Sequence, residues 1–313
     1  MLKHRLFFGA ILIAVLVGMI YADNWLSGAF ASDQTREAFK GIGLYSFNGP
    51  FVTIVIVGLV ILGTWELHRL FVGAGHGPLL IWPALINIFL VLTTFFARNG
   101  PAAGEIGRRS VDYQYTVVWL TMALVGTAFL IARRRRTERA IGDIATTLLL
   151  ILYLGLLPQY LLRVRVADPS GGVWLLLYFV GTVKICDIGA YFTGRAVGRH
   201  KLIKWLSPGK TVEGLAGGVA CSILVAVLVP WLVEKYASSS SDLHGLFPGL
   251  GRACVFGLLM ALVGQAGDLL ESLFKRDAQA KDSANAVPAF GGVLDILDSP
   301  LLAAPIAYLM LVE

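Results

Sequence analysis

Acidic and basic residues gather near the C-terminal end of a chain that is otherwise mostly apolar. Residues 264–300 contain five Asp, one Glu, two Lys and one Arg, with apolar runs on both sides. Carboxylate oxygens are the ligands that Mg²⁺ prefers in proteins, and lysine and arginine form strong, charge-assisted contacts with phosphate. Together these residue types indicate chemistry on a phosphate-bearing substrate, assisted by a divalent cation.

The first half of this stretch has the spacing of one helix face. Asp268, Glu271 and Lys275 follow one another at i, i+3 and i+7, so we expect them to point the same way from a helix. Two carboxylates one turn apart suit a hydrated Mg²⁺ ion. Lys275, Arg276 and Lys281 can neutralise a polyphosphate.

The second half combines a flexible turn with two more acids. The glycine pair at 291–292 permits a tight turn, and Asp295 and Asp298 are three residues apart. Ser299 followed by Pro300 predicts the N-cap and first position of the last helix, which leaves Asp298 just outside it. These acids could simply cap a helix, but the convergence of several acids and bases favours a functional interpretation.

Two further motifs lie upstream. Lys184 and Asp187 are three residues apart and share a helix face, either as part of a site or as a structural ion pair at the membrane edge. Residues 207–211 read SPGKT and lead into an apolar run, so Lys210 and a helix N-terminus could together attract an anion. The GxxxxGK[ST] pattern of a P-loop is absent. The alternative is an interfacial turn with a snorkelling lysine.

Composition shows what kind of structure must position these motifs. Of 313 residues, 57% are hydrophobic and 15% are charged, with a mean hydropathy of +0.73, whereas soluble domains carry about 25% charged residues. We therefore predict an all-α polytopic membrane protein, because backbone in lipid must satisfy its own hydrogen bonds. The net charge of +6 is attributed to topology and lipid-surface attraction, with no nucleic-acid partner. The cysteines lack metal or disulfide spacing and are interpreted as packing residues.

The apolar runs predict nine transmembrane helices. The first run resembles a secretory signal peptide, but an uncleaved span is favoured because a suitable cleavage site lies far from it. Lysine and arginine are biased toward alternate loops, which favours a cytoplasmic N-terminus and places both long motif-bearing loops in the cytoplasm. We divide the chain into N-terminal spans at 1–140 and a catalytic membrane domain at 141–313. The predicted spans are 6–22, 51–71, 79–97, 116–132, 143–162, 173–191, 212–233, 251–271 and 296–312.

Other charged segments have simpler interpretations. The loop at 98–115 contains Glu105, Arg108, Arg109 and Asp112, which we expect to be solvated surface. The four arginines at 133–136 are interpreted as a stop-transfer anchor that touches anionic lipid.

The motifs of this chain resemble those of a known family. Phosphatidate cytidylyltransferases carry a C-terminal signature of the form S-x-x-K-R-x4-K-D-S, then P-G-H-G-G, then L-D-R-x-D-S. Upstream they carry D-x-G-A-Y-F-x-G-R and S-P-x-K-T-x-E-G-x-x-G-G. The resemblance covers about residues 140–312. The matching segments here are SLFKR at 272–276, KDS at 281–283, PAFGG at 288–292, LDILDS at 294–299, DIGAYFTGR at 187–195 and SPGKTVEGLAGG at 207–218.

The resemblance implies an activity. It implies that CTP and phosphatidate give CDP-diacylglycerol and pyrophosphate with Mg²⁺, one cation or two, in a bacterial inner membrane with the active site on its cytoplasmic side. Similar members are dimers, so a homodimer is also implied. By motif position the metal ligands are Asp268, Asp295 and Asp298. Further catalytic residues are Asp187, Lys275, Arg276, Lys281 and Asp282. Substrate-binding residues are Ser207, Lys210, Thr211, Glu213, Gly291, Gly292 and Ser299.

Three positions depart from the signature. Phe290 stands where the family has His, Ile296 where it has Arg, and Ala289 where it has Gly. Phe290 in place of His removes a proton donor or metal ligand. Ile296 in place of Arg removes a planar guanidinium group suited to binding phosphate. Because the acids and the Lys–Arg pair remain, we expect a working enzyme.

Three alternatives stay open. The chain could be a CTP-using enzyme for another membrane lipid, such as a polyprenol kinase, a transporter, or an inactive scaffold. Acids at the inner surface, not at mid-span, argue against a transporter. For cytidylyl transfer we expect direct attack by the lipid phosphate on the α-phosphorus of CTP, because a phosphate monoester with a second pKa of about 6 is already anionic at neutral pH.

Overall fold

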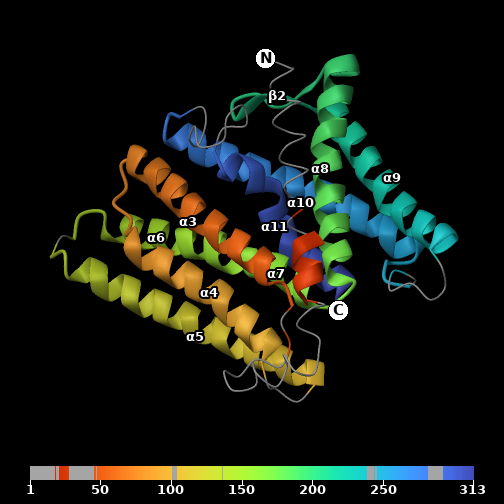
Figure 1. The fold of residues 1–313 in the computed structure, drawn as a ribbon. Coiled ribbons are helices and arrows are strands. Elements are labelled where there is room, and N and C mark those ends of the chain that lie inside the picture. Colours follow the sequence, from red (N-terminus) through yellow and green to blue (C-terminus); the bar gives the residue numbers. More distant parts are fainter. Residues whose placement is uncertain are drawn as a thin grey trace. The chain divides into compact units, whose positions relative to one another are not determined.

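The computed structural model describes residues 18, 21–27, 46, 48–100, 104–135, 137–237, 243, 245–280 and 292–313, with the side chains of 104–106 left aside. These residues are mainly helical, and two short strands form one antiparallel pair (Figure 1). The expected all-α class is confirmed, although the strands were not predicted. The chain divides into two compact units, Met1–Pro169 with Asp277–Asp295, and Ser170–Arg276 with Ile296–Glu313. The functional division expected at residue 140 stays a prediction.

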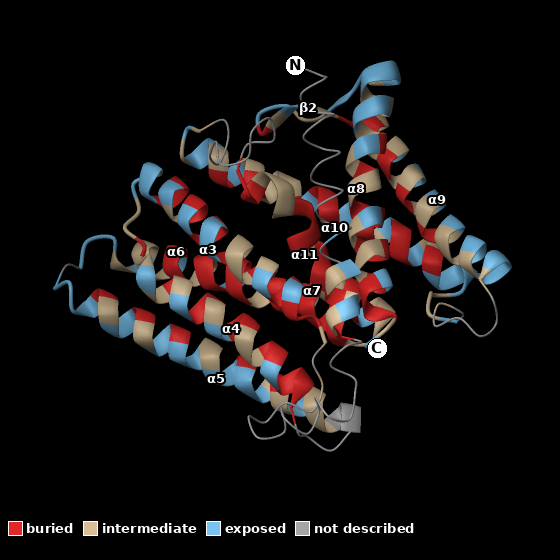
Figure 2. Ribbon diagram, in the orientation of Figure 1, coloured by how far each residue is buried: buried red, intermediate tan, exposed pale blue. Residues whose placement is uncertain are grey.

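Helix α4 is the centre of the first unit. It packs against α3, α5 and α7, and the buried side chains Ile86 and Leu90 face Ala123 and Ile151. Figure 2 shows buried residues along the inner faces of these helices and exposed residues along the outer side of α5. The helices are α3 (Pro50–Gly73), α4 (Ile81–Asn99), α5 (Gly104–Ala132), α6 (Ala140–Ile151), the π-helical turn η1 (Leu152–Leu156) and α7 (Leu157–Val166).

The turn η1 joins α6 and α7 into one continuous span, Ala140–Val166. Pro158 lies at the start of α7 and has no backbone N–H, and its ring would clash with the carbonyl of Leu154 in a regular helix. A π-helical turn widens the helix there and accommodates the proline.

The second unit is held together by small residues between its helices. Helices α8 and α9 lie side by side, and a side chain at Gly189 would collide with Cys221, while one at Gly218 would collide with the backbone of Cys186. Close helix approach through small residues is typical of membrane proteins. The elements are α8 (Gly172–Val197), β1 (Lys201–Ile203), β2 (Ser207–Thr211), α9 (Val212–Tyr236), α10 (Leu250–Asp277) and α11 (Leu294–Leu311).

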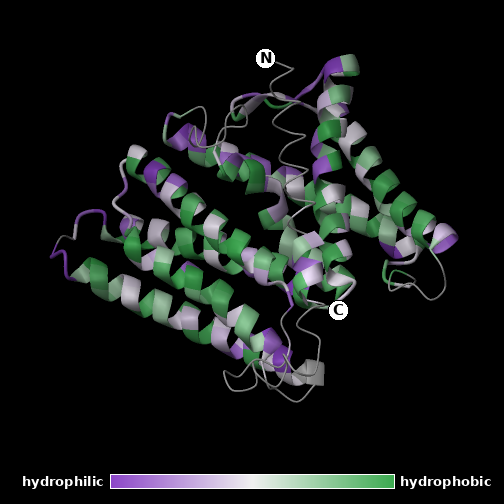
Figure 3. Ribbon diagram, in the orientation of Figure 1, coloured by the Kyte–Doolittle hydropathy of each residue, from purple (hydrophilic) through white to green (hydrophobic). Residues whose placement is uncertain are grey.

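Eight helices in the described part of the chain are long and apolar enough to cross a membrane. They match the last eight predicted spans, and Figure 3 shows hydrophobic residues along them, with hydrophilic residues concentrated at helix ends and connections. The predicted first span, 6–22, falls almost entirely outside the described residues. The side of the membrane on which the N-terminus lies stays a prediction.

Two predictions about local structure were wrong. Helix α11 begins at Leu294, so Ser299 and Pro300 lie inside it and Asp298 is helical. The expected solvated loop at 98–115 is wrong for Asp112, because α5 starts at Gly104 and Asp112, inside this helix, is 1% exposed.

The partners of Asp112 explain the second error. Its carboxylate lies 3.1 Å from Arg98 Nε on α4 and 2.8 Å from Arg163 Nε on α7. These arginines are far from Asp112 in the sequence, so no local pattern predicts the contact.

Candidate functional site

Charged side chains from three helices and a strand of the second unit form one connected group. On α8, Lys184 Nζ lies 3.4 Å from Asp187 Oδ2, which confirms the shared helix face. Gln265 on α10 donates to Asp187 Oδ1 at 2.7 Å, and the Ser299 hydroxyl on α11 donates to Asp187 Oδ2 at 3.4 Å. Asp187 therefore connects α8 to both α10 and α11.

The SPGKT segment brings a lysine into this group. It forms strand β2, and Thr211 then caps α9 by accepting the Gly214 N–H at 3.1 Å. This fixes the position of Lys210, whose ammonium lies 2.6 Å from Asp268 Oδ2 and donates to Gln265 Oε1 at 2.9 Å. Lys210 is therefore an ion-pair partner within the group and not an isolated interfacial lysine.

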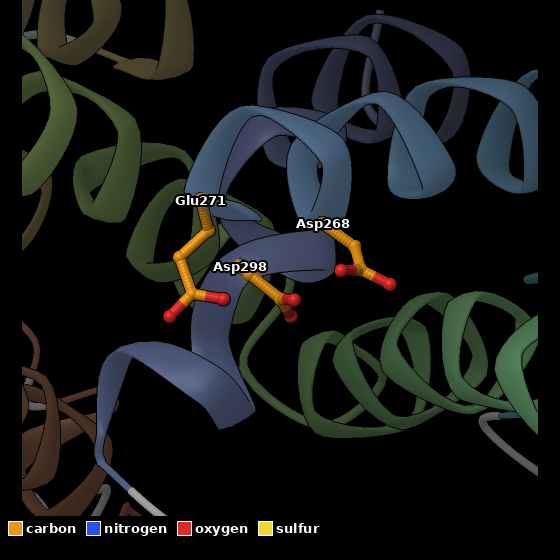
Figure 4. Close-up of side chains that lie close together, drawn as sticks. All are labelled: Asp268, Glu271 and Asp298. Atoms are coloured by element: carbon orange, nitrogen blue, oxygen red, sulfur yellow. The ribbon is translucent and has the colours of Figure 1, made fainter. Parts of the chain in front are cut away.

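Three carboxylates form the acidic centre of the group. Asp268 and Glu271 stand one turn apart on α10, Asp298 comes from α11, and ligand oxygens of all three lie within 4.8 Å of one another. Figure 4 shows Asp298 between the other two, with the three carboxyl groups turned toward a common region. Gly267 makes this possible, because a β-carbon there would collide with the Asp298 carbonyl oxygen.

Each of these acids has a lysine beside it. Lys210 pairs with Asp268, Lys275 Nζ lies 2.8 Å from Glu271 Oε2, and Lys184 Nζ lies 3.6 Å from Asp298 Oδ1. The lysines offset the repulsion that three adjacent carboxylates would otherwise experience.

The donor set fits a hard divalent cation. It offers only carboxylate oxygens, with no sulfur or imidazole among the three residues, and Asp268 is half-buried and so leaves room for water ligands. Such a set suits Mg²⁺, Ca²⁺ or Mn²⁺ better than Zn²⁺ or copper. Among the described residues, Asp268, Glu271 and Asp298 are thus those that could hold a metal.

Other predicted residues have different surroundings. Asp295 lies in the first turn of α11 and accepts the Gly292 N–H at 2.7 Å, so its expected role as a metal ligand stays a prediction. Ile296, at the position of the family's Arg, follows it in the same turn. Lys281, Asp282, Phe290 and Gly291 lie outside the described residues.

Residues expected to bind substrate or support catalysis also shape the β1–β2 hairpin. Ser207 pairs with Ile203 across the strands. Glu213 accepts the N–H groups of Arg199 and His200, and Arg276 Nε donates to the carbonyl of Leu206 at 3.2 Å. These contacts hold the hairpin that carries Lys210, and the substrate roles of Ser207, Glu213 and Arg276 stay predictions.

One residue of interest was missed from the sequence. Glu66 on α3 is fully buried, and its two carboxylate oxygens accept the N–H groups of Val293 at 2.9 Å and Leu294 at 3.0 Å. It therefore caps the N-terminus of α11 within the first unit. The available signal was an ionisable residue inside an apolar run, which is costly in a membrane and usually has a purpose.

Comparison with known proteins gives a consistent family match. The sequence profile of the Cytidylyltransferase family matches residues 39–312, which is most of the chain.

Named relatives come from several bacteria. The phosphatidate cytidylyltransferase of Chlamydia pneumoniae is 32% identical over 275 residues, covering 86% of this chain and 83% of that protein. The phosphatidate cytidylyltransferase of Haemophilus influenzae is 28% identical, covering 84% of this chain and 90% of that protein. The protein of that name from Synechocystis sp. is 37% identical over 198 residues, covering 55% of this chain and 63% of its own length.

Proposed function

Since the chain belongs to the cytidylyltransferase family, we propose that it transfers the cytidylyl group of CTP to phosphatidate, giving CDP-diacylglycerol and pyrophosphate. The observation that carries the proposal is the group of acids and lysines in the second unit, where Asp268, Glu271 and Asp298 adjoin Lys184, Lys210 and Lys275. A site of this composition suits a polyphosphate and a divalent cation better than it suits acyl or sugar chemistry.

Asp268, Glu271 and Asp298, which lie close together, would hold Mg²⁺, with Asp295 as the further ligand that the family resemblance implies. When bound, the cation supplies charge neutralisation and orientation of the triphosphate. Lys184, Lys210 and Lys275 have flexible stems, and each ammonium can exchange its carboxylate partner for a phosphate oxygen. They supply the positive charge that the pyrophosphate leaving group requires.

The reaction needs no strong general base. A phosphatidate oxygen attacks the α-phosphorus of CTP, a new P–O bond forms, and the bond to the β-phosphate breaks. The second pKa of the lipid phosphate is about 6, so the nucleophile is already an anion at neutral pH. Consistent with this, the sequence of residues 264–300 contains no histidine. Catalysis then rests on positioning and charge neutralisation.

Eight candidate spans and bacterial relatives indicate an integral membrane protein. We propose that the site lies on the cytoplasmic side of the inner membrane, where CTP is available, because the sequence segments 184–211 and 272–281 are rich in lysine and arginine. The homodimer implied by the family resemblance is part of the same proposal.

The test uses purified protein in mixed micelles with phosphatidate, labelled CTP and Mg²⁺. We expect CDP-diacylglycerol and pyrophosphate in equal amounts, and an Asp268→Asn variant should lose at least ~100-fold in rate. Asp277→Asn is the matched control, because Asp277 is exposed at the end of the same helix and lies outside the carboxylate cluster. Chelation of the cation should abolish the rate of the unmodified protein.

Two outcomes would contradict the proposed reaction. One is no lipid product above the level of Asp268→Asn. The other is release of CDP with a phosphorylated lipid, because that product pair identifies a lipid kinase.

A further inference from the structure

The first unit contains a polar hollow that the proposed reaction does not use. It has a volume of about 690 Å³ and lies between the α3–α4 connection and the α5–α6 connection. Its polar lining comes from His76, Gly77, Arg134, Glu138, Arg139 and Asp143.

Backbone contacts hold the two arginines of the hollow in place. Arg134 Nη1 donates to the Gly77 carbonyl at 2.6 Å, and Arg139 Nη1 donates to the Gly75 carbonyl at 2.8 Å. Asp143 accepts the Gly77 N–H at 2.6 Å and lies 3.6 Å from Arg134 Nη1. Hydrogen bonds and an ion pair thus join the α3–α4 and α5–α6 connections around the hollow.

The hollow retains capacity to bind an anion. Within the described part of the chain, Arg134 and Arg139 use only Nη1 in polar contacts, so the Nε and Nη2 donors of both remain for a ligand. An arginine fork with two parallel donors matches a phosphate group. Arg139 is also the N-cap residue of α6 and provides no side-chain cap, so the positive end of the α6 dipole adds to the attraction.

Charges around the hollow favour a negatively charged ligand. The described residues of the loop, 133–135 and 137–139, carry Arg133 and Arg135 besides the two lining arginines, against Glu138 and Asp143, which also line the hollow. Among these described residues, four guanidinium groups thus outnumber two carboxylates.

The position of the hollow favours a lipid over a soluble anion. Helix α3 ends at Gly73, α5 ends at Ala132 and α6 begins at Ala140, and all three belong to candidate membrane spans. The hollow therefore lies at the membrane–water boundary. Ile141 in the first turn of α6 is 84% exposed, and Phe129 in the last turn of α5 is 61% exposed. Apolar side chains next to a basic hollow suit acyl chains below a headgroup.

We propose that this hollow binds the phosphodiester headgroup of an acidic phospholipid of the surrounding bilayer. Basic pockets at the ends of transmembrane helices recognise such headgroups. This is more specific than attraction of an arginine run to a charged surface, because Arg134 and Arg139 are fixed by the α3–α4 connection, and Arg133 and Arg135 of the same loop do not line the hollow.

The test compares two double variants of the full-length protein in nanodiscs of phosphatidylcholine with added phosphatidylglycerol. Arg134→Gln with Arg139→Gln alters the hollow, and Arg133→Gln with Arg135→Gln removes the same charge from the same loop outside it. Lipid retention is measured by native mass spectrometry. The first pair should weaken phosphatidylglycerol binding roughly 10- to 30-fold, and the second far less. Equal losses in both pairs, or equal retention of phosphatidylcholine, would overturn the proposal.

A third variant and a free anion complete the test. Glu138→Gln removes a lining carboxylate and should tighten phosphatidylglycerol binding several-fold, a gain that misfolding cannot produce. Inorganic phosphate, titrated in detergent, should bind far more weakly than the lipid. Phosphate affinity equal to that of the lipid, or no gain from Glu138→Gln, would contradict a lipid headgroup site.

Discussion

The two units each contain charged side chains within their membrane helices, but the two groups differ in exposure. In the first unit, Asp112 lies between Arg98 and Arg163, and all three side chains are 0–1% exposed. In the second unit, Asp187, Asp268 and Lys184 retain 29–33% exposure, and the acids Asp298 and Glu271, which are 8% and 1% exposed, belong to the same group. A charged group that water or a ligand cannot reach at any member is structural, whereas a group with accessible members can do chemistry.

The two groups also differ in how their charges are arranged. Asp112 is surrounded by donors, because Thr94 and both arginines bond to it, and Arg163 also stacks on Tyr113 and Tyr160. In the second unit, three carboxylates adjoin one another, and lysines offset them individually. Opposite charges that alternate stabilise a fold, whereas like charges placed together oppose folding and persist where a function needs them.

The largest expected effect on stability comes from the buried group of the first unit, Asp112 with Arg98 and Arg163. Asp112→Ala leaves Arg98 and Arg163 buried without their acid, so we expect the free energy of unfolding to fall by about 3–5 kcal/mol. Unfolding in mixed micelles measures this. Asp112→Asn, which keeps the hydrogen-bonding shape, should lose less. The rate per folded molecule should be unchanged, and a selective loss of rate would contradict the structural interpretation.

The acids and lysines of the second unit should show the reverse pattern, with a large loss of rate and little loss of stability. Asp298→Asn should lower the rate of CDP-diacylglycerol formation by roughly 10²–10³-fold, or about 3–4 kcal/mol, because it removes one of three clustered ligand oxygens. The unfolding midpoint without added cation should stay the same or rise, because repulsion among the carboxylates decreases. A midpoint that falls as far as that of Asp112→Ala would show that both groups are structural.

A smaller effect tests the close approach of α10 and α11, which brings the carboxylates of the second unit together. Gly→Ala in a helix interior normally stabilises by up to about 1 kcal/mol, and Gly181, with open space around it inside α8, should follow this rule. Gly267→Ala on α10 should instead destabilise by about 1–3 kcal/mol, because the new β-carbon meets the Asp298 carbonyl. It should also lower the rate. Equal midpoints for the two variants would show that α10 and α11 do not approach closely at Gly267.

The sequence predicted those parts of the site that depend on local spacing. Lys184 with Asp187, and Glu271 with Lys275, face each other because residues three or four apart share a helix face. The eight described spans were predictable because a bilayer requires long apolar helices. The family resemblance pointed to Lys210 and Asp298 as members of the same site, and they are in the same connected group.

Contacts between distant segments could not be predicted in the same way. The start of α11 was placed at Pro300 because a Ser–Pro pair is typical of a helix N-terminus. The structure starts it at Leu294, since Glu66, more than 200 residues earlier, accepts the first backbone N–H groups. Asp112 was misplaced for the same reason, because its arginines belong to other helices.

Glu66 gives the mildest test, because it caps the start of α11 within the first unit, and Asp298 lies one turn further along the same helix. Glu66→Gln keeps one acceptor oxygen and replaces the other by a donor that faces a backbone N–H. We expect the free energy of unfolding to fall by about 1.5 kcal/mol, and the rate to fall less than 10-fold, since α11 continues through its own hydrogen bonds. Unfolding and rate should be measured on the same preparation. If Glu66→Gln abolished the rate and left stability unchanged, exposure alone would not separate structural from catalytic charges in this protein.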